Sequence, residues 1–421
     1  MRGRDREVWI TGLGIVTPIG IGLDGFWAGL HAGKSAVKRI DRFDPSAFRS
    51  QVAAQIDDFE PTDHMDPKAA RQTDRFSQFA LAAGRLALAD AQLEIGARNS
   101  PRGDRFAVYI GSALGGIAYA EEQHVRYMER GIRTVAPNLA LAVFGGAAPA
   151  NVGIALGLHG PILSTANSCA AGAVAIGEAL RLVRSGAADA ALAGGVEVPL
   201  SPLAFGAFDI IRALGAGHND QPQDAARPFD AGRDGFVLGE GAALLVLEAR
   251  EVAEKRGATP YAELRGYAAT SDAFHMVQPR PDGVQAARAA RLALADGRMK
   301  AADVDYVNAH ASSTPLGDAV EARAIARALG ARASKVAVSG TKAYYGHPLG
   351  ASGAIEACIC ALAIARGWAP GTVNLSNVDP EVSRYVPGVR AEPLEGKIAG
   401  VLSTSFGFGG LNAALAFHAT R

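Results

Sequence analysis

The sequence is poor in cysteine, with three in 421 residues. A small secreted domain held together by disulfides is therefore excluded, and a reducing compartment is indicated. An excess of either charge is also missing, because Lys+Arg and Asp+Glu both number 42. A neutral chain produces no broad field that would attract nucleic acid or an anionic membrane. An acidic partner would therefore have to bind a local basic patch.

Long uninterrupted hydrophobic runs are missing too. The charged start of the chain leads straight into a strand-like Val8-Trp9-Ile10, without the apolar core of a signal peptide. The most membrane-like stretch, residues 138–157, is interrupted by Asn138, Pro149 and several glycines, which is typical of a buried segment and not of a span. We therefore expect a soluble, cytoplasmic protein with neither a membrane nor a nucleic acid as its partner.

Short hydrophobic runs alternate with longer segments of helical pattern along the chain, which is 49% hydrophobic and has no low-complexity linker. This alternation predicts a layered α/β fold with a large core. The predicted strands are residues 106–110, 187–193, 242–247, 304–307 and 399–404. The predicted helices are residues 76–91, 170–184, 284–295, 319–328 and 354–365.

The two halves of the chain show a faint likeness. Each begins with a strand that is expected to end at a glycine, at residues 9–12 and again at residues 263–266. Each later has a strand that opens into a loop rich in polar and small residues. We therefore predict a duplication with its boundary near Gly257, giving halves 1–257 and 258–421.

Cys169 follows a predicted strand and begins an Ala/Gly-rich predicted helix. Unpaired N–H groups at a helix N-terminus favour the thiolate, so this thiol is a candidate nucleophile; a buried, inert cysteine remains the alternative. Cys358 and Cys360 lie two residues apart in an apolar helix, so they face different sides and belong to the core. No CxxC or His-rich spacing indicates a metal site.

Two histidines lie in unusual loops. His310 follows a predicted strand, and His347 lies in a glycine-rich loop that opens a helix. A single loop histidine is usually solvated or already hydrogen-bonded. Two of them beside a cysteine that begins a helix fit a nucleophile and its acid–base partners.

Two glycine-rich segments need interpretation. Residues 403–412 place glycines around phenylalanines, which predicts a mobile turn whose N–H groups could bind an oxyanion; a hairpin with buried aromatics is the alternative. The Gly12-Leu13-Gly14 segment does not form a dinucleotide-binding fingerprint, because Thr17 stands where the third glycine would fall.

Taken together, these segments resemble the β-ketoacyl-[acyl-carrier-protein] synthases, and most closely the type II elongating enzymes of bacterial fatty-acid synthesis. The likeness covers essentially the whole chain. It includes residues 8–14, 227–241 and 271–276, in the order that the family has them.

The resemblance implies a thiolase-like fold of two βαβαβαββ halves in five α-β-α-β-α layers, usually dimeric. It also implies that Cys169, His310 and His347 form the catalytic set, and that Lys342 and Glu356 form a buried pair beneath it. Cys169 would accept the acyl group. The two histidines would stabilise the enolate formed as malonyl-carrier protein loses carbon dioxide. No metal or other cofactor is expected.

The resemblance further implies that Phe406 gates the site, and that the N–H groups of Cys169 and Phe406 form the oxyanion hole. The expected partner is an acidic acyl carrier protein, which would dock near the cations Lys68, Arg71 and Arg212. A homodimer is expected, and a heterodimer with a synthase-like subunit remains open.

Several positions depart from the family's usual residues without removing a catalytic group. They are Asn167 and Ser168 before the cysteine, Ala311 and Ser312 after the first histidine, Tyr345, and Leu411 after the glycine-rich turn. These differences leave open whether the pathway makes housekeeping fatty acids or a dedicated polyketide or polyene.

Two other functions share these features. A thiolase using acyl-CoA would need a second reactive cysteine in its C-terminal glycine loop, which residues 406–410 lack. A non-catalytic subunit of the chain-length-factor type would lack the nucleophile, whereas Cys169 is present.

Overall fold

The computed structural model describes residues 6–95 and 102–420. Its main sheet has 11 strands, ordered β11-β10-β14-β15-β9-β1-β8-β7-β5-β6, with β2 (Gly20–Ile21) paired to β1. The main strands of the first half are β1 (Val8–Thr17), β5 (Phe106–Gly111), β6 (Ile162–Thr165), β7 (Ala190–Glu197) and β8 (Gly241–Ala249). Those of the second half are β9 (Ala262–Ser271), β10 (Tyr306–Ala309), β11 (Ala337–Gly340), β14 (Gly400–Gly407) and β15 (Leu411–His418).

The longer helices lie between and outside these strands. They are α1 (Gly22–Ala32), α3 (Arg75–Asp90), α4 (Ile117–Arg130), α6 (Ala147–Leu156), α7 (Ala171–Arg184), α8 (Pro202–Ile210), α10 (Val284–Asp296), α11 (Pro315–Leu329) and α13 (Ser352–Arg366). The shorter elements are α2 (Pro67–Gln72), α5 (Leu139–Ala142), α9 (Arg250–Lys255), α12 (Lys342–Tyr345), α14 (Pro380–Ser383), β3 (Lys38–Arg39), β4 (Val52–Ala53), β12 (Trp368–Ala369) and β13 (Leu394–Glu395).

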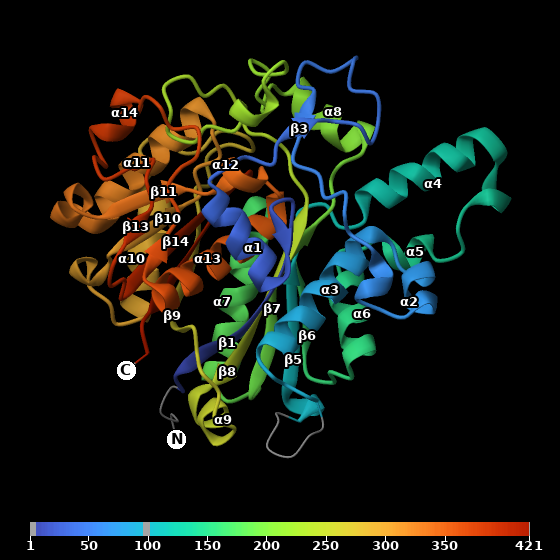
Figure 1. The fold of residues 1–421 in the computed structure, drawn as a ribbon, viewed down its shortest axis with the longest axis horizontal. Coiled ribbons are helices and arrows are strands. Elements are labelled where there is room, and N and C mark those ends of the chain that lie inside the picture. The colour runs from blue at the N-terminus through green and yellow to red at the C-terminus, as the bar shows by residue number, and fades with distance from the viewer. Residues whose placement is uncertain (1–5, 96–101, 421) are drawn as a thin grey trace.

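Strand order and helix packing produce five layers. Helices α3 and α6 cover the outer face of the first half-sheet, and α10 and α11 cover that of the second. Helices α7 and α13 pack against each other between the two half-sheets, as Figure 1 shows. Both halves follow the order βαβαβαββ, so the predicted α/β thiolase-like fold is confirmed. All ten helices and strands predicted from the sequence are present, with ends shifted by a few residues.

Burial on both faces explains why the strands read as continuous hydrophobic runs. Along β8, Ala243, Leu245 and Leu247 face the central helices, whereas the alternate residues Leu244 and Val246 face α3. Successive side chains of a strand point to opposite faces, so a sheet covered on both sides needs apolar residues at every position.

The expectation that β1 and β9 end at glycines is wrong. Both strands continue past Gly12 and Gly266, to Thr17 and Ser271. The glycines are needed for close packing, because a Cβ on Gly12 would lie 2.3 Å from the carbonyl oxygen of Ala87 on α3. A Cβ on Gly266 would meet a carbonyl oxygen of α10 at 2.1 Å.

The same strand–helix joint occurs in both halves. The N–H of Leu13 donates to Asp90 at the end of α3 at 2.8 Å, and the N–H of Tyr267 donates to Asp296 at the end of α10 at 3.0 Å. The two half-sheets meet through a short antiparallel pairing of β1 with β9. These matching joints are what a duplicated chain would contain.

The most membrane-like helix is not the stretch expected from the sequence. Residues 138–157 form the separate helices α5 and α6. The apolar stretch long enough to cross a membrane is Leu349–Arg366, and 89% of it is buried inside the protein. This stretch contains α13, which packs as a helix of the protein core.

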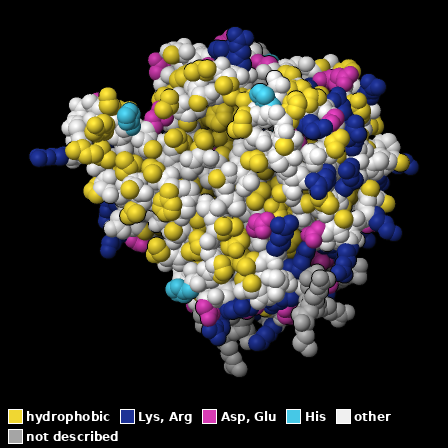
Figure 2. Space-filling model, turned by 180° about the vertical axis from the view of Figure 1, so that it is seen from behind, with side chains coloured by type: hydrophobic (Ala, Val, Ile, Leu, Met, Phe, Trp, Pro, Cys, Tyr) yellow, Lys and Arg dark blue, Asp and Glu magenta, His cyan; other side chains and the backbone are white. Residues whose placement is uncertain are grey.

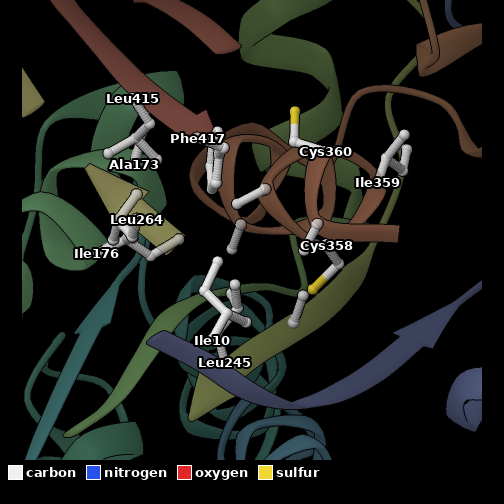
Figure 3. Packing of buried hydrophobic residues seen from close by; sticks show 14 of the residues in the cluster. Ile10, Ala173, Ile176, Leu245, Leu264, Cys358, Ile359, Cys360, Leu415 and Phe417 are labelled. Atoms are coloured by element: carbon white, nitrogen blue, oxygen red, sulfur yellow. The ribbon is translucent and has the colours of Figure 1, made fainter. Parts of the chain in front are cut away.

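The buried cysteines of α13 are confirmed as core residues. Cys358 and Cys360 are free thiols, both fully buried. Figure 3 shows them on different sides of the helix, with Cys358 toward Ile10 and Leu245.

Hydrophobic side chains are also exposed, and they gather in the first half. Helix α4 projects from the body in Figure 1. Figure 2 shows the opposite side, where hydrophobic side chains spread over the part of the surface beside α4, and Lys and Arg cluster on the other part.

Candidate active site

Three loops at the ends of buried strands bring the predicted catalytic residues together. Cys169 lies in a 3₁₀ turn, Ser168–Ala170, directly before α7. His310 follows β10, and His347 lies in the loop before α13. Because α7 and α13 occupy equivalent places in the two halves, Cys169 and His347 stand near the starts of the paired central helices.

The three side chains form one compact cluster. The Cys169 Sγ and a ring nitrogen from each histidine lie within 4.8 Å of one another, and all three residues are buried. The two imidazole centroids are 5.3 Å apart and nearly perpendicular. This spacing lets the carbonyl group of an acyl thioester contact the sulfur and both rings.

Cys169 is held in a strained turn. The preceding residue, Ser168, has φ of 51°, and its hydroxyl lies 3.8 Å from Sγ. Burial raises the pKa of the Cys169 thiol to about 11, although the Ser168 hydroxyl and the N–H of Phe408 favour the thiolate. The sequence predicted an activated thiol from the helix N-terminus alone, whereas in the structure burial outweighs that effect. A neighbouring base must therefore take the proton when the sulfur attacks.

His310 is fixed from both sides. Its backbone N–H donates to Glu321 at 2.8 Å, and its ring Nδ1 lies 3.4 Å from the Lys342 ammonium nitrogen. Burial, Lys342 and His347 hold the pKa of His310 well below its usual range, so the ring is neutral. An ammonium group can only donate, so Nδ1 must be the acceptor and Nε2 must carry the proton.

His347 has a more versatile partner. Its Nδ1 lies 2.8 Å from the hydroxyl oxygen of Ser352, and its ring packs edge-on against Phe236. Burial and Lys342 hold the pKa of His347 well below its usual range. A hydroxyl both donates and accepts, so His347 can adopt either neutral tautomer.

Lys342 and Glu356 form a buried ion pair beneath the histidines, with side chains 2% and 0% exposed. Lys342 also donates to the carbonyl oxygen of His310. Burial raises the pKa of Glu356 to about 7, against the pull of Lys342. The pair directs all three ammonium protons and so fixes the orientation of His310.

Two glutamates that support the site were missed in the sequence. Glu321 accepts from the N–H groups of His310 and Ala311, and burial raises its pKa to about 7. Glu197, at the end of β7, accepts from the N–H of Ala113 at 2.7 Å and from that of Gly350 at 2.9 Å. The available signal was an acidic residue inside an otherwise apolar segment, which usually means a hydrogen-bonded buried carboxylate.

The structure places Phe408, and not Phe406, at the nucleophile. The N–H of Phe408 points to the Cys169 thiol, and its ring packs in the same apolar cluster as Cys169. The ring of Phe406 instead lies 6.1 Å from that of His310 and packs against the alanines of α10 and α11. The second oxyanion donor expected at Phe406 is therefore better placed at Phe408.

One group of side chains among the described residues has the chemistry to hold a metal ion. Cys169, His310 and His347 offer one sulfur and two nitrogens, but the proton that Lys342 keeps on Nε2 of His310 makes that ring a poor ligand.

A cavity of about 310 Å³ leads from the surface to the three catalytic candidates. Phe236, Phe406 and Phe408 line it, and Arg212 stands among the residues that surround it. The other two predicted docking cations, Lys68 and Arg71, are exposed on the short helix α2 and do not line this cavity.

Comparisons with known proteins agree with this geometry. The model of the β-ketoacyl synthase N-terminal domain matches residues 5–253, and that of the C-terminal domain matches residues 261–376. The chain is 44% identical to 3-oxoacyl-[acyl-carrier-protein] synthase 2 of Coxiella burnetii, covering 97% of this chain and 98% of that one. It is also 44% identical to the enzyme of the same name from Synechocystis, covering 98% of both chains.

Solved structures show the same likeness. A β-ketoacyl synthase from Burkholderia phymatum superimposes with a TM-score of 0.90 at 38% identity, covering 99% of this chain and 100% of that one. The ketosynthase AntDE, solved in complex with its type II polyketide carrier protein AntF, gives 0.91 at 32% identity with the same coverage. The resemblance predicted from the motifs is thus confirmed, and this chain belongs to the β-ketoacyl synthase family.

Proposed function

We propose that this enzyme is a 3-oxoacyl-[acyl-carrier-protein] synthase, which condenses an acyl group on Cys169 with a malonyl group delivered by an acyl carrier protein. The products are carbon dioxide and a 3-oxoacyl group, longer by two carbons, on the carrier. The observation that supports this most strongly is the buried Cys169–His310–His347 cluster, within 4.8 Å, at the end of an aromatic-lined cavity.

Acylation comes first. Because burial raises the pKa of Cys169 to about 11, its proton must pass to a base as the sulfur attacks the thioester. His347 can accept that proton on Nε2 while its Nδ1–H donates to Ser352. The N–H groups of Cys169 and Phe408 then hold the oxyanion, and the leaving carrier thiol takes the proton back from His347.

Decarboxylation and condensation follow. The malonyl thioester carbonyl accepts hydrogen bonds from His310 and His347, so the electron pair released with carbon dioxide is stabilised as an enolate. The enolate carbon attacks the acyl-Cys169 carbonyl, the tetrahedral intermediate collapses, and the Cys169 sulfur leaves. His347 must now donate a hydrogen bond from Nε2, the atom that accepted the proton during acylation. The Ser352 hydroxyl permits this change, because it can accept from Nδ1 in the first step and donate to Nδ1 in the second. His310 is held by Lys342 as a permanent donor.

The experiment is incubation with malonyl-carrier protein and a ladder of acyl-carrier proteins, with the product masses measured. We expect 3-oxoacyl products two carbons longer than each accepted donor. The preferred donor length would also separate housekeeping fatty-acid synthesis from a dedicated polyketide or polyene pathway. A thiolase would instead need a second thiol, whereas Cys358 and Cys360 lie buried within α13. A chain-length-factor-like subunit would gain no acyl adduct.

The gate is the next proposal, and the geometry favours Phe408 over the predicted Phe406. Phe408 stands between Gly407 and Gly409, and Gly409 and Gly410 have φ of 83° and 68°, which other residues rarely adopt. The turn can therefore swing and move the Phe408 ring away from Cys169.

Phe408→Ala should change the ratio of self-acylation rates between long and short acyl-carrier proteins more than Phe406→Ala does. The Phe406 variant is the matched control, since it removes an equal ring two residues earlier, at the end of β14. Stopped samples analysed by intact mass spectrometry give both rates. A larger change with Phe406→Ala would show that Phe406 is the gate, as the family resemblance implies.

Two copies of the chain are proposed to pair through the edge strand β6. This strand ends the sheet and exposes Ile162 and Leu163, at 47% and 37%. An exposed apolar edge strand presents unpaired N–H and C=O groups, with which a strand of another chain can pair. The heterodimer with a synthase-like subunit would use the same edge.

Sedimentation of the purified chain should give twice the chain mass of 43.4 kDa. Leu163→Lys should shift it toward the monomer, because a charge cannot be buried without a partner. Leu292→Lys, at an exposed leucine of α10, is the control and should leave the dimer intact. A wild-type monomer that dimerises only with a second synthase-like chain would favour the heterodimer.

The remaining proposals concern location and organisation. The chain is that of a soluble enzyme, and we propose that it works in the cytoplasm, where carrier-protein substrates and reduced thiols coexist. We also propose the division into halves 1–257 and 258–421. The repeated joints Leu13–Asp90 and Tyr267–Asp296 support that division.

A further inference from the structure

The residue directly before the nucleophile carries a hydroxyl group, and it is one of the positions at which this chain departs from its family. This residue, Ser168, is partly buried, and its hydroxyl oxygen lies 3.8 Å from the Cys169 sulfur. A hydrogen bond to sulfur is longer than one to oxygen, because the sulfur atom is larger. The hydroxyl donates and the sulfur accepts. Ser168 therefore touches the reacting atom of the site.

The Ser168 hydroxyl is free to serve the sulfur. Among the residues that the structure describes, it has no other hydrogen-bond partner. Other serine hydroxyls of the site are already engaged, since Ser112 donates to Glu197 at 2.9 Å and Ser352 pairs with His347 at 2.8 Å. A hydroxyl turns about its own C–O bond, so the Ser168 proton can follow charge that appears on the sulfur.

The backbone fixes Ser168 in this place. Its φ of 51° lies in the left-handed region, which residues with a side chain rarely adopt unless their surroundings hold them there. Those surroundings include the turn after β14, because a Cβ on Gly407 would lie 3.1 Å from both the Ser168 Cβ and the Cys169 nitrogen. Ser168 and Cys169 belong to one 3₁₀ turn, so the hydroxyl stays beside the sulfur when the glycine-rich turn moves.

The charged and titratable groups around the sulfur do little to stabilise a thiolate. Burial holds the pKa values of His310 and His347 well below their usual range, so both rings are neutral. Lys342 lies in its buried ion pair and favours the thiolate, whereas Glu197 opposes it. Negative charge on Cys169 therefore depends on hydrogen-bond donors.

Two donors reach the sulfur, and one of them has a second task. The N–H of Phe408 points to the Cys169 thiol, but the same N–H is the proposed donor to the oxyanion. In each tetrahedral intermediate it must leave the sulfur to bind the oxyanion. The intermediate then collapses while that N–H is still on the oxygen, just as negative charge arrives on the sulfur. The Ser168 hydroxyl has no competing task at that moment.

We propose that Ser168 is a further catalytic residue, whose hydroxyl donates to the Cys169 sulfur whenever that sulfur bears negative charge. This happens as the thiol passes its proton to His347 during acylation. It happens again when the C–S bond of the second tetrahedral intermediate breaks and the sulfur leaves with the electron pair. The Ser168 proton stays on its own oxygen throughout, so the hydroxyl needs no regeneration. The proposal rests on the proposed function, because it assigns a role within that reaction.

Ser168→Ala removes the hydroxyl and keeps the Cβ. Alkylation of Cys169 by iodoacetamide at fixed pH should become about 3-fold slower. Loss of the donor raises the thiol pKa by about one unit, which lowers the thiolate fraction about 10-fold, and the greater nucleophilicity of a more basic thiolate offsets part of that loss. Self-acylation should slow by a similar factor with KM for the acyl-carrier protein unchanged. Malonyl decarboxylation should keep its rate, because the two histidines stabilise the enolate.

Peptide mass spectrometry measures the alkylation of Cys169 separately from that of the buried thiols. Ser185→Ala is the matched control, because it removes an exposed serine hydroxyl at the far end of α7, where it donates to the carbonyl oxygen of Leu182. This control should be alkylated at the wild-type rate. Ser168→Gly is the second test variant. It also lacks the hydroxyl but accepts a positive φ without strain, so it should be alkylated as slowly as Ser168→Ala.

A wild-type alkylation rate in Ser168→Ala would overturn the proposal. Recovery of the rate by Ser168→Gly would also overturn it, since the loss would then come from backbone strain and not from the missing donor. An equal loss of malonyl decarboxylation would do the same, because it would show a disturbed site. Alkylation needs neither a carrier protein nor an acyl group. Absence of an acyl adduct on wild type with every donor would therefore count against the proposed function, while the alkylation rates would still test Ser168.

Discussion

Cys169→Ala is expected to reduce condensation below detection and to abolish the acyl-enzyme. Cys169 is the thiol that lines the cavity, and the other two thiols are fully buried in α13. Without a covalent intermediate the acyl group has no route to the enolate, so no slower parallel pathway should remain.

Intact mass spectrometry after incubation with acyl-carrier protein checks this result. Cys358→Ala is the matched control, because it removes a thiol from the same protein without touching the cavity, and it should still gain one acyl adduct. An acyl adduct on the Cys169→Ala protein would mean that another residue is the nucleophile.

His310→Ala and His347→Ala should each slow malonyl decarboxylation by about 10²–10⁴-fold, as is usual when an acid–base or oxyanion group is removed. Their effects on self-acylation should differ. Lys342 donates to Nδ1 of His310 and so keeps that ring's proton on Nε2, which leaves His310 no part in accepting the thiol proton. His347 is the base that can accept the thiol proton, because the Ser352 hydroxyl can either donate to its Nδ1 or accept from it.

The measurement follows carbon dioxide release from malonyl-carrier protein and acylation of Cys169 in parallel. His310→Ala should keep a nearly normal acylation rate, whereas His347→Ala should acylate more slowly. Rapid decarboxylation by the double variant would contradict the role of the histidines. Equal acylation rates in the two single variants would refute the division of labour between them.

The fold was predictable because hydrophobic runs encode it directly. A short apolar run such as residues 242–247, which follows Gly239 and Gly241, indicates a strand buried on both faces, and β8 is one. The ends of β1 and β9 were not predictable in this way. Gly12 reads as a strand terminator, but its lack of a side chain is needed for the approach of α3, a partner that lies 75 residues further along the chain.

The site was predictable as a set of residues and only in part as an arrangement. Cys169, His310 and His347 stood out because their loops combine reactive side chains with glycine and serine, and the structure brings them together. Phe406 and Phe408 both lie beside glycine, so no local pattern shows which N–H faces the thiol. That choice depends on where the turn after β14 lies relative to the start of α7.

The docking cations illustrate a similar gap. Lys68 and Arg71 came from the resemblance, yet they lie on α2 and away from the cavity lining. Which exposed cations lie near the cavity mouth depends on tertiary structure, and the sequence alone does not show it.

The central claim is that one residue, Cys169, carries the acyl group between two carrier-bound substrates. It is tested most directly by loading the wild-type enzyme with an acyl-carrier protein, mapping the adduct by peptide mass spectrometry, and then adding malonyl-carrier protein. We predict an adduct on the peptide that contains Cys169, discharged on addition of malonyl-carrier protein into a 3-oxoacyl product with release of one carbon dioxide. An adduct on another peptide, or one that malonyl-carrier protein leaves in place, would contradict the account.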